Sequence, residues 1–510
     1  MQLPAGFRHV TMASGIRSSV ARAPDKPALI CAGRSLTFAQ LADRIGRVGA
    51  LARHGLGLQA GQVAAIVAGN CLEYIEIVDG LAEAGIPVAT PNPRQTAAEL
   101  GFILQDCGAT VAFVSPDCEA LLRGADCPAL ARIIVIGAEY EALLAQARPD
   151  PGLSPAAEWD AFAIPYTSGT TGRPRGIVLP HRSRALVGFC MASEYGCYGP
   201  DDRFLAVTPL FHGAGYSFAH ASVFFGGTCE ILTRADPEVI LERLCHGGIT
   251  GGITGTFLVP TIFHAMFALE PRLLDRFRNT SLRALMSNAA PLPQRTKELI
   301  VDYFGDDVLH ELYGSTEGGI VCNLRPRDQL RKQSCVGHAF TMNEVKLLDP
   351  DGNPVKPGET GELFNRSPCL FLGYWNNPEA SKAALRDGWF SAGDLARQDE
   401  DGCYYIVDRK KDMFISGGVN VYPRDIEECL FRYPGVCDAA VIGVPDAYWG
   451  EVGKAFLVTA DGASIEADAV IAWCKEKLAG YKVPRHVTVV EALPRNAAGK
   501  VLKTALRTLP

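Results

Sequence analysis

A segment rich in glycine and hydroxyl side chains, Tyr166 to Gly176, is the part of the chain best suited to bind a polyphosphate. It reads YTSGTTGRPRG. Glycines let backbone N–H groups approach a phosphate closely, and Ser and Thr hydroxyls donate hydrogen bonds to its oxygens. The G-x-x-x-x-G-K-[ST] spacing is absent, so the segment is not a Walker A loop. On composition alone, a flexible surface turn is the alternative.

The segment resembles the phosphate-binding loop of the adenylate-forming enzymes, which include acyl-CoA synthetases, 4-coumarate:CoA ligases, firefly luciferase and peptide-synthetase adenylation domains. Further motifs follow in the family's order from about Leu36 to Lys503. The resemblance implies nucleotide binding in this loop by Thr167, Ser168, Gly169, Thr170, Thr171, Gly172 and Arg175. Arg175 replaces a more usual Lys, which keeps the charge and changes its geometry.

Two later motifs resemble the adenine-binding and acyl-binding segments of the family. SNAAPL resembles the loop along the adenine, formed here by Asn288, Ala289 and Ala290. Family members commonly have Gly at the first two of these positions, and binding through the backbone should tolerate the change. PLFHGAG resembles the segment beside the reacting carboxylate, which implies a role for His212. A structural histidine is the alternative.

The motif YGSTE resembles the family's strand end at the nucleotide. The resemblance implies that Tyr313 stacks on adenine, with Gly314 and Ser315 beside it, and that the Thr316 hydroxyl contacts the α-phosphate. Glu317 is the implied magnesium ligand, because a carboxylate beside phosphates would repel them without the ion. Core packing for Tyr313 and a helix N-terminal charge for Glu317 are the structural alternatives.

Three segments near the C-terminus complete the resemblance. Asp394 and Arg409 resemble the residues that hold the ribose hydroxyls, since a carboxylate can accept two O–H bonds. Lys411 falls at the family's hinge, although the charged run around it also suits a plain solvated linker. Gly417 and Gly418 are implied to line the pantetheine tunnel, with a simple β-turn as the alternative.

The motif PRNAAGKVLK resembles the C-terminal loop that carries the family's catalytic lysine, here Lys500. When a carboxylate attacks the α-phosphate, negative charge accumulates on both groups. A preorganised ammonium between them stabilises that transition state better than water does. Arg495 and Lys503 stand where Lys and Arg are more usual, which puts only contacts to pyrophosphate in doubt.

The elements that must carry these residues alternate between strands and helices. Short β-branched runs at 63–67, 111–114 and 133–136 are separated by helical stretches such as 41–51. A capping box of Thr37 and Gln40 opens that helix. The alternation recurs from 204 to 317 and predicts an α/β protein with two lobes, each built on a largely parallel sheet.

From about Val336 the pattern changes to short strands with Asp-Gly turns at 351–352 and 401–402, which predicts a β-rich lobe. We predict an AMP-binding N-terminal domain over 1–410. A small mobile α+β domain over 411–510 follows, hinged at Lys411. Its predicted helices are 424–432 and 467–478, and its predicted strands are 439–444 and 455–458.

Composition excludes several classes of protein. The chain is 48% hydrophobic and 21% charged with a net charge of -7, and its basic residues are scattered, which argues against a nucleic-acid partner. No run approaches the ~20 apolar residues of a membrane span, and the N-terminus lacks a secretory signal. We predict a cytoplasmic protein without integral membrane association, and leave a homodimer open.

The 16 cysteines form no C-x-x-C pair and are predicted to be reduced and buried.

The resemblance as a whole implies an ATP-dependent carboxylic acid:CoA ligase that uses ATP, Mg2+ and coenzyme A and forms an acyl-adenylate. No Lys or Arg lies between Phe204 and Thr233, which favours a fatty, alicyclic or aryl acid, because a second carboxylate would be buried without a partner. One alternative delivers the acyl group to a carrier protein, but the chain stops ten residues after Lys500. A luciferase-like oxygenase would share every motif, but this sequence has no peroxisomal S-K-L ending. A non-catalytic nucleotide-binding paralogue should have lost Lys500 or Glu317.

Overall fold

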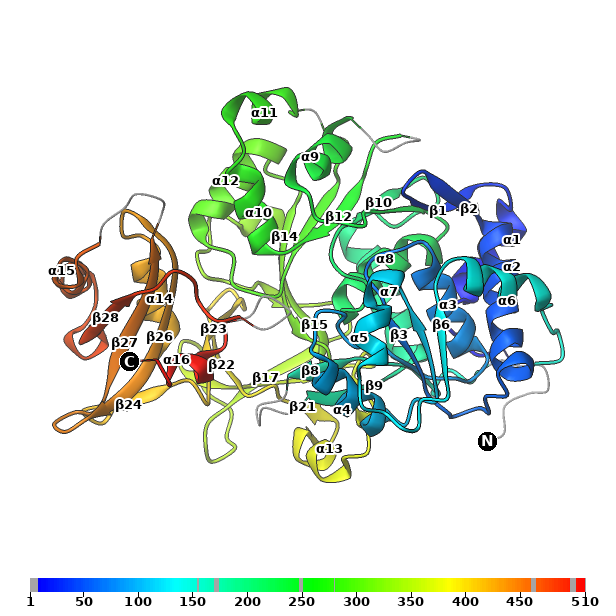
Figure 1. The fold of residues 1–510 in the computed structure, drawn as a ribbon. Helices are drawn as coiled ribbons and strands as arrows, with labels where there is room; N and C mark the ends of the chain where they lie inside the picture. The colour runs from blue at the N-terminus through cyan, green and yellow to red at the C-terminus, as the bar shows by residue number, and fades with distance from the viewer. Residues whose placement is uncertain are drawn as a thin grey trace.

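Two sheets flanked by helices form most of the N-terminal part of the chain in the computed structural model, which describes residues 8–153, 156–168, 174–246, 251–278, 280–459, 465–495 and 501–509 (Figure 1). The first sheet has the order β19-β9-β7-β4-β3-β5-β6, with β8 paired to β9. Its strands are β3 (Ala64–Val67), β4 (Val88–Ala89), β5 (Val111–Val114), β6 (Arg132–Val135), β7 (Ala161–Ile164), β8 (Tyr166–Ser168), β9 (Pro174–Pro180) and β19 (Gly373–Tyr374).

The second sheet has the order β16-β15-β14-β13-β12-β10-β11-β1-β2. It is parallel from β14 to β1 and antiparallel at both edges, where hairpins end it. The strands are β1 (Pro27–Cys31), β2 (Arg34–Thr37), β10 (Arg203–Ala206), β11 (Thr228–Ile231), β12 (Gly255–Leu258), β13 (Ala284–Ser287), β14 (Leu309–Ser315), β15 (Gly319–Leu324) and β16 (His338–Ala339). The first sheet is parallel from β7 to β6 and antiparallel at β9. The predicted largely parallel α/β character of both sheets is therefore confirmed.

Helices cover these sheets and carry the apolar faces that the sequence indicates. Phe38, Leu41, Ile45 and Val48 are the buried stripe of α2, and Thr37 forms the predicted capping box with Gln40. The largest apolar core joins the inner faces of the two sheets through α3, α7 and α8. The helices of this part are α1 (Ser14–Arg22), α2 (Phe38–Ala50), α3 (Glu73–Glu83), α4 (Ala97–Cys107), α5 (Glu119–Arg123), α6 (Ala138–Gln146), α7 (His181–Tyr195), α8 (Gly213–Phe224), α9 (Pro237–His246), α10 (Pro260–Phe267), α11 (Pro271–Arg276) and α12 (Gln294–Phe304).

A third, antiparallel sheet follows, with the order β20-β21-β18-β22-β23 and β17 paired to β18. Its strands are β17 (Glu344–Leu348), β18 (Thr360–Arg366), β20 (Leu385–Arg386), β21 (Trp389–Phe390), β22 (Asp394–Gln398) and β23 (Tyr404–Arg409), with α13 (Pro378–Ala384) before β20. Gly352 and Gly402 have φ of 87° and 81° in the two predicted Asp-Gly turns. The third sheet starts at β17, because β16 still belongs to the second sheet.

The remaining residues form the C-terminal unit (residues 414–509), whose sheet has the order β25-β24-β27-β26 with β28 beside β27. It contains β24 (Phe414–Ser416), β25 (Val419–Val421), β26 (Val436–Asp446), β27 (Gly450–Thr459), β28 (His486–Val489), α14 (Pro423–Leu430), α15 (Ala467–Lys477) and α16 (Lys503–Leu506). It packs its own apolar core around Phe414, Val441 and Leu457. Figure 1 shows it in orange and red beside β22 and β23 of the large unit (residues 8–409).

The remaining expectations on cysteines and membranes can be compared with this fold. All 16 cysteines are free, and most are buried, as predicted; Cys437 is exposed. Across the described ranges, no helix is both long enough and apolar enough to cross a bilayer.

Candidate active site

The ends of β14, β22 and β23 bring three predicted site residues together. Asp394 and Arg409 are paired in register on β22 and β23, and Arg409 Nε lies 3.0 Å from Asp394 Oδ1. The hydroxyl of Tyr313 donates to Asp394 Oδ2 at 2.6 Å. Burial, and then the neighbouring Asp394 carboxylate, raise the pKa of Tyr313 well above its ordinary value, so its hydroxyl stays protonated. The three side chains form one connected polar cluster.

Glu317 lies in the tight connection from β14 to β15, close to a tyrosine and an arginine of the first sheet. Its carboxylate accepts a 3.0 Å hydrogen bond from the Tyr374 hydroxyl on β19, and its carbonyl accepts from the Phe371 N–H. The Arg175 guanidinium lies 5.6 Å from the centre of the Tyr374 ring. Burial raises the pKa of Glu317, which Tyr374, Arg409 and Arg175 oppose. A carboxylate in this setting favours a bound cation.

The glycine of YGSTE is needed to build that connection. A Cβ on Gly314 would lie 2.1 Å from the carbonyl oxygen of Gly319, so no other residue fits without moving the hairpin. The Ser315 hydroxyl accepts from the Gly318 N–H at 2.9 Å and closes the turn. In this structure Gly314 and Ser315 therefore shape the loop that presents Thr316 and Glu317.

The loop before α8 brings His212 to the same place. The His212 N–H donates to the Pro209 carbonyl at 3.1 Å, and its carbonyl accepts from the N–H of Tyr216. A Cβ on Gly213 would lie 3.6 Å from Cγ2 of Thr316, so this loop and YGSTE are in van der Waals range. Burial lowers the pKa of His212, which keeps the imidazole neutral at neutral pH and able to donate one hydrogen bond.

The predicted adenine loop is held by a buried ion pair that the motif does not contain. Glu311 on β14 accepts the N–H of Leu292 at 3.2 Å and pairs with Lys297 of α12, and both charged side chains are buried. Within the loop, Asn288 Oδ1 accepts the N–H of Ala289 at 2.7 Å. Ala289 has φ of 79°, in the left-handed region where Gly is favoured. Ala289 and Ala290 are exposed.

Sequence analysis missed Glu311 and Lys297. Glu311 lies two residues before Tyr313, and a carboxylate between the apolar residues of a buried strand was the available signal. Lys297 has no comparable signal, because its partner lies on another element.

Part of the phosphate-binding motif is framed by a hairpin. Thr167 on β8 pairs with Arg175 on β9, and Tyr166 pairs with Gly176. The Tyr166 hydroxyl donates to Asp106 at 2.5 Å, so this residue anchors the hairpin to α4. Gly169, Thr170, Thr171, Gly172 and the side chain of Ser168 lie outside the described residues.

The predicted pantetheine-contacting glycines are not at this site in the structure. Gly417 and Gly418 form the turn between β24 and β25, with φ of 57° and 80°. Figure 1 shows β24 at the outer end of the C-terminal unit, away from β14 and β15. The Gly417 N–H donates to the Trp449 carbonyl at 2.8 Å, and a Cβ on Gly417 would meet the Trp449 ring at 2.8 Å.

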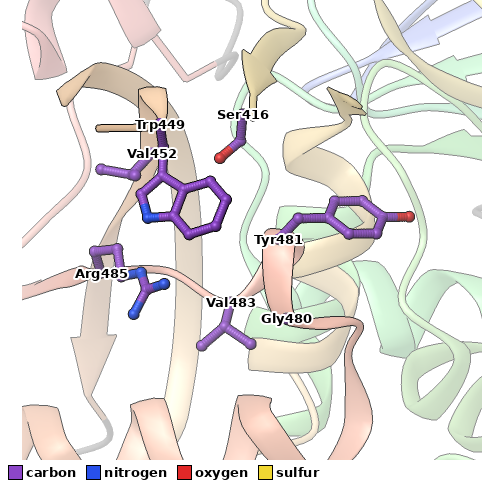
Figure 2. Close-up of a pocket in the computed structure, with 7 residues that line it drawn as sticks. All are labelled: Ser416, Trp449, Val452, Gly480, Tyr481, Val483 and Arg485. Carbon is purple, nitrogen blue, oxygen red and sulfur yellow. The ribbon is translucent and has the colours of Figure 1, made fainter. Parts of the chain in front are cut away.

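A pocket of about 270 Å³ opens next to this turn. Figure 2 shows the Trp449 ring at its centre, with Arg485 and Tyr481 on opposite sides. Ser416, Val452, Gly480 and Val483 complete the lining.

Two further predicted residues lie near the boundary of the C-terminal unit. Lys411 is exposed in the turn between β23 and β24. Lys500 lies outside the described residues; Arg495 and Val501, the nearest described residues on either side of it, form an antiparallel bridge. Arg495 is paired with Asp438 on β26.

Comparison with known proteins adds independent findings. A family model described as AMP-binding enzyme matches residues 16–375, and one described as AMP-binding enzyme C-terminal domain matches residues 425–500. The chain is 36% identical over 492 residues to a feruloyl-CoA synthase from Amycolatopsis sp, covering 95% of this chain and 96% of that protein. It is 34% identical over 503 residues to a 2-succinylbenzoate–CoA ligase from Geobacillus kaustophilus, covering 98% of each.

Solved structures agree with this match over the whole chain. ATP-bound MatB from Rhodopseudomonas palustris, 30% identical, superimposes with a TM-score of 0.90 over 98% of both chains. Apo MatB from the same organism, 29% identical, gives a TM-score of 0.80 over 98% of both chains. The present arrangement is therefore more similar to the ATP-bound form.

Proposed function

The chain belongs to the AMP-binding enzyme family, and from that premise we propose that it is an ATP-dependent carboxylic acid:CoA ligase that works through an acyl-adenylate. The observation that carries the proposal is the convergence of Tyr313, Asp394, Arg409 and Glu317 at one strand edge, with Thr316 and His212 alongside. Relatives over the full length are named as acid:CoA ligases.

The connected cluster supplies the nucleotide contacts. The Tyr313 ring offers a face to adenine while its hydroxyl is held by Asp394. Asp394 keeps further lone pairs on both oxygens, so it can accept the ribose hydroxyls without losing Tyr313 or Arg409. Thr167 and Arg175, together with the loop between β8 and β9, receive the phosphates.

Glu317 would hold magnesium together with the phosphates of ATP, and the ion would neutralise charge on the pyrophosphate. Desolvation raises the pKa of this half-buried carboxylate, so a bound cation would stabilise its charged form. The described part of the chain contains no cluster of three or more His, Cys, Asp or Glu that could hold a metal by itself. One carboxylate plus substrate phosphates is the usual way in which proteins bind this ion.

In the first reaction a carboxylate oxygen of the acid attacks the α-phosphorus of ATP. The acyl O–P bond forms and the bond from the α-phosphorus to the bridging oxygen breaks, which releases pyrophosphate. Lys500 balances the charge shared by the two anions, and the Thr316 hydroxyl donates to the α-phosphate. Neutral His212 donates to the substrate carboxylate and holds it in line for attack.

In the second reaction the C-terminal unit rotates about Lys411 and brings Gly417 and Gly418 to the adenylate. The thiol of CoA attacks the acyl carbon, the C–S bond forms, AMP leaves, and the thiol proton is released. Two features support CoA as the acceptor: the glycines give a slender chain close access, and the neighbouring pocket offers the rings of Trp449 and Tyr481 with the Arg485 guanidinium, a combination suited to a nucleotide (Figure 2).

The acid itself is a fatty, alicyclic or aryl acid. The segment from Phe204 to Thr233 contains no Lys or Arg, and α8 within it is largely buried among aromatic side chains such as Phe218 and Phe257, whose rings stack at 4.4 Å. A second carboxylate would find no cation in that segment. We place the enzyme in the cytoplasm, where ATP and CoA are supplied, with a homodimer as the oligomer to test.

A panel of acids tests the proposal. Acetate, hexanoate, cyclohexanecarboxylate, a cinnamate and malonate are incubated with ATP, magnesium and purified protein, with and without CoA. Pyrophosphate release and the mass of the thioester are measured. We expect an apolar acid to give both products, and Glu317→Gln to lower pyrophosphate release at least tenfold. Glu379→Gln, an exposed carboxylate on α13, is the matched control.

Three results would contradict the proposal. Absence of pyrophosphate release with every acid would favour a non-catalytic paralogue. Adenylation followed by transfer only to a carrier protein would replace CoA as the acceptor. A clear preference for malonate or acetate would place the acyl-binding segment elsewhere.

A further inference from the structure

A buried carboxylate lies on the large-unit side of the predicted hinge and bonds across it. Asp408, the penultimate residue of β23, is 7% exposed. Its Oδ1 accepts the N–H of Arg409 at 2.7 Å, and its Oδ2 accepts the N–H of Arg424 at 3.0 Å. Arg424 lies in the first turn of α14 in the C-terminal unit. One carboxylate thus ties together residues on both sides of Lys411.

A cation from the C-terminal unit faces the same carboxylate. Lys503, the first residue of α16, pairs with Glu427 of α14 at 2.8 Å, and Glu427 also accepts the N–H of Val441 on β26. Burial lowers the pKa of Lys503, but Glu427 and then Asp408 outweigh it and raise the value. Lys503 is therefore a half-buried, protonated cation that is paired with Glu427 and interacts electrostatically with Asp408 of the other unit.

The neighbouring contacts follow the same face of α14. Glu428 accepts the Ser334 hydroxyl at 2.7 Å, and Arg432, just after the helix, donates to Gln333 at 3.4 Å. Arg424, Glu428 and Arg432 are spaced by four residues, which places them on one helical face. Asp408 lies at the end of this row nearest the hinge, so it contacts the part of the C-terminal unit that a rotation about Lys411 displaces.

The position of Lys503 in the chain links this contact to catalysis. Lys503 follows Lys500 by three residues in the sequence and comes just after Val501, which forms an antiparallel bridge with Arg495. The bond from Asp408 to Arg424 fixes α14, and with it Lys503, relative to the strand that carries Arg409. Arg409 in turn is paired with Asp394 in the polar cluster that also contains Tyr313.

We propose that Asp408 is a positioning residue that, through Arg424 and Lys503, holds the C-terminal unit in the arrangement that presents Lys500 for adenylation. The inference rests on the proposed function, because it assigns the two half-reactions to two arrangements of the unit. The contact must break before the thioester step, since the N–H of Arg424 and the ammonium of Lys503 move together while Asp408 stays with β23.

The test separates the half-reactions. Adenylation is followed by ATP–pyrophosphate exchange with the best acid, and thioester formation by CoA-thioester production from the synthetic acyl-AMP. Asp408→Asn, which keeps the shape and loses the charge, should lower exchange about tenfold and leave the thioester rate unchanged or faster. Lys503→Met should have the same effect, whereas Lys503→Arg, which keeps the positive charge, should retain the exchange rate of the wild type. Glu400→Gln, exposed at the other end of the β22–β23 hairpin, is the matched control.

A second readout reports the arrangement directly. Lys410 and Lys411 are exposed in the connecting turn, so trypsin cleavage there measures how freely the hinge moves. Asp408→Asn and Lys503→Met should each be cleaved several-fold faster than the wild type. The double variant should be cleaved no faster than either single variant, because the two changes remove the same interaction. This comparison holds even if one variant is too unstable for kinetics.

The outcomes distinguish this inference from the proposed function. A wild type inactive in both half-reactions contradicts the proposed function. In the other case, the wild type is active in both half-reactions and the variants at Asp408 and Lys503 lose the exchange rate and the thioester rate equally, or lose neither. Either result overturns the role of Asp408. A loss of exchange in Lys503→Arg as large as that in Lys503→Met would also overturn this role.

Discussion

Replacing Gly215 by alanine should disrupt the active site through a backbone collision, and the same change at Gly213 supplies a matched comparison. A Cβ on Gly215 would lie 2.2 Å from the carbonyl oxygen of Pro209 and 3.2 Å from that of Thr208. Real Cβ atoms do not approach oxygen so closely, and neither carbonyl belongs to a flexible side chain. The turn from Pro209 to His212 must open to accept the methyl group.

The size of the effect follows from the two geometries. Overpacking a buried site costs about 1–3 kcal/mol, and Gly215 is buried. A methyl group on Gly213 would instead lie 3.6 Å from Thr316, an ordinary contact. Alanine is a better helix former than glycine by up to about 1 kcal/mol. Gly213→Ala should therefore keep or raise the thermal stability, and Gly215→Ala should lower it.

Adenylation should fall further than stability in Gly215→Ala. Opening the turn moves His212 relative to Thr316, and a displacement near 1 Å can reduce a rate by roughly 100-fold. Fluorimetry gives the melting temperature, and ATP–pyrophosphate exchange, measured below the melting transition, gives the rate of adenylation. An unchanged melting temperature with unchanged exchange in Gly215→Ala would refute the backbone argument and the placement of His212.

Two further changes test the mechanism. Lys500→Ala should greatly slow adenylation and spare thioester formation from synthetic acyl-AMP, because only the first reaction places charge between carboxylate and phosphate; equal loss of both rates would contradict this role. Lys411→Pro should allow acyl-AMP to form and then stall, because proline fixes φ near ~-65°, and normal steady-state thioester production would return the turn to a plain linker.

Local sequence signals predicted the elements well, because each depends on residues close in the chain. The capping box at Thr37, the strand at 111–114 and the strand at 344–348 agree with the structure. The order of strands did not follow from such signals. β19 joins the first sheet from nearly two hundred residues beyond β9, and β1 joins the second sheet beside β11. These pairings depend on how distant apolar faces are buried together, which periodicity does not report.

The site shows the same division between local and distant information. A motif can name Tyr313 and Asp394, since each lies within a short recognisable run. It cannot show that the Tyr313 hydroxyl is bonded to Asp394, that Tyr374 bonds to Glu317, or that Lys297 neutralises Glu311. Those partners come from other sheets and helices, and their side chains carry no distinguishing spacing. The contacts that orient the site are therefore the part that needed coordinates.

The proposed function gives a physical reason why Gly417 and Gly418 lie apart from the polar cluster of Tyr313, Asp394 and Arg409. In a single arrangement, the ammonium that serves adenylation and the glycines that admit a thiol would compete for the same face of the acyl group. A moving C-terminal unit removes that conflict by presenting them in turn. The superposition on ATP-bound MatB, closer than that on the apo form, and the hydrogen bond from the Arg424 N–H to Asp408 both suit the first arrangement. Motifs that are colinear in sequence need not meet in one structure, because the chemistry uses them at different times.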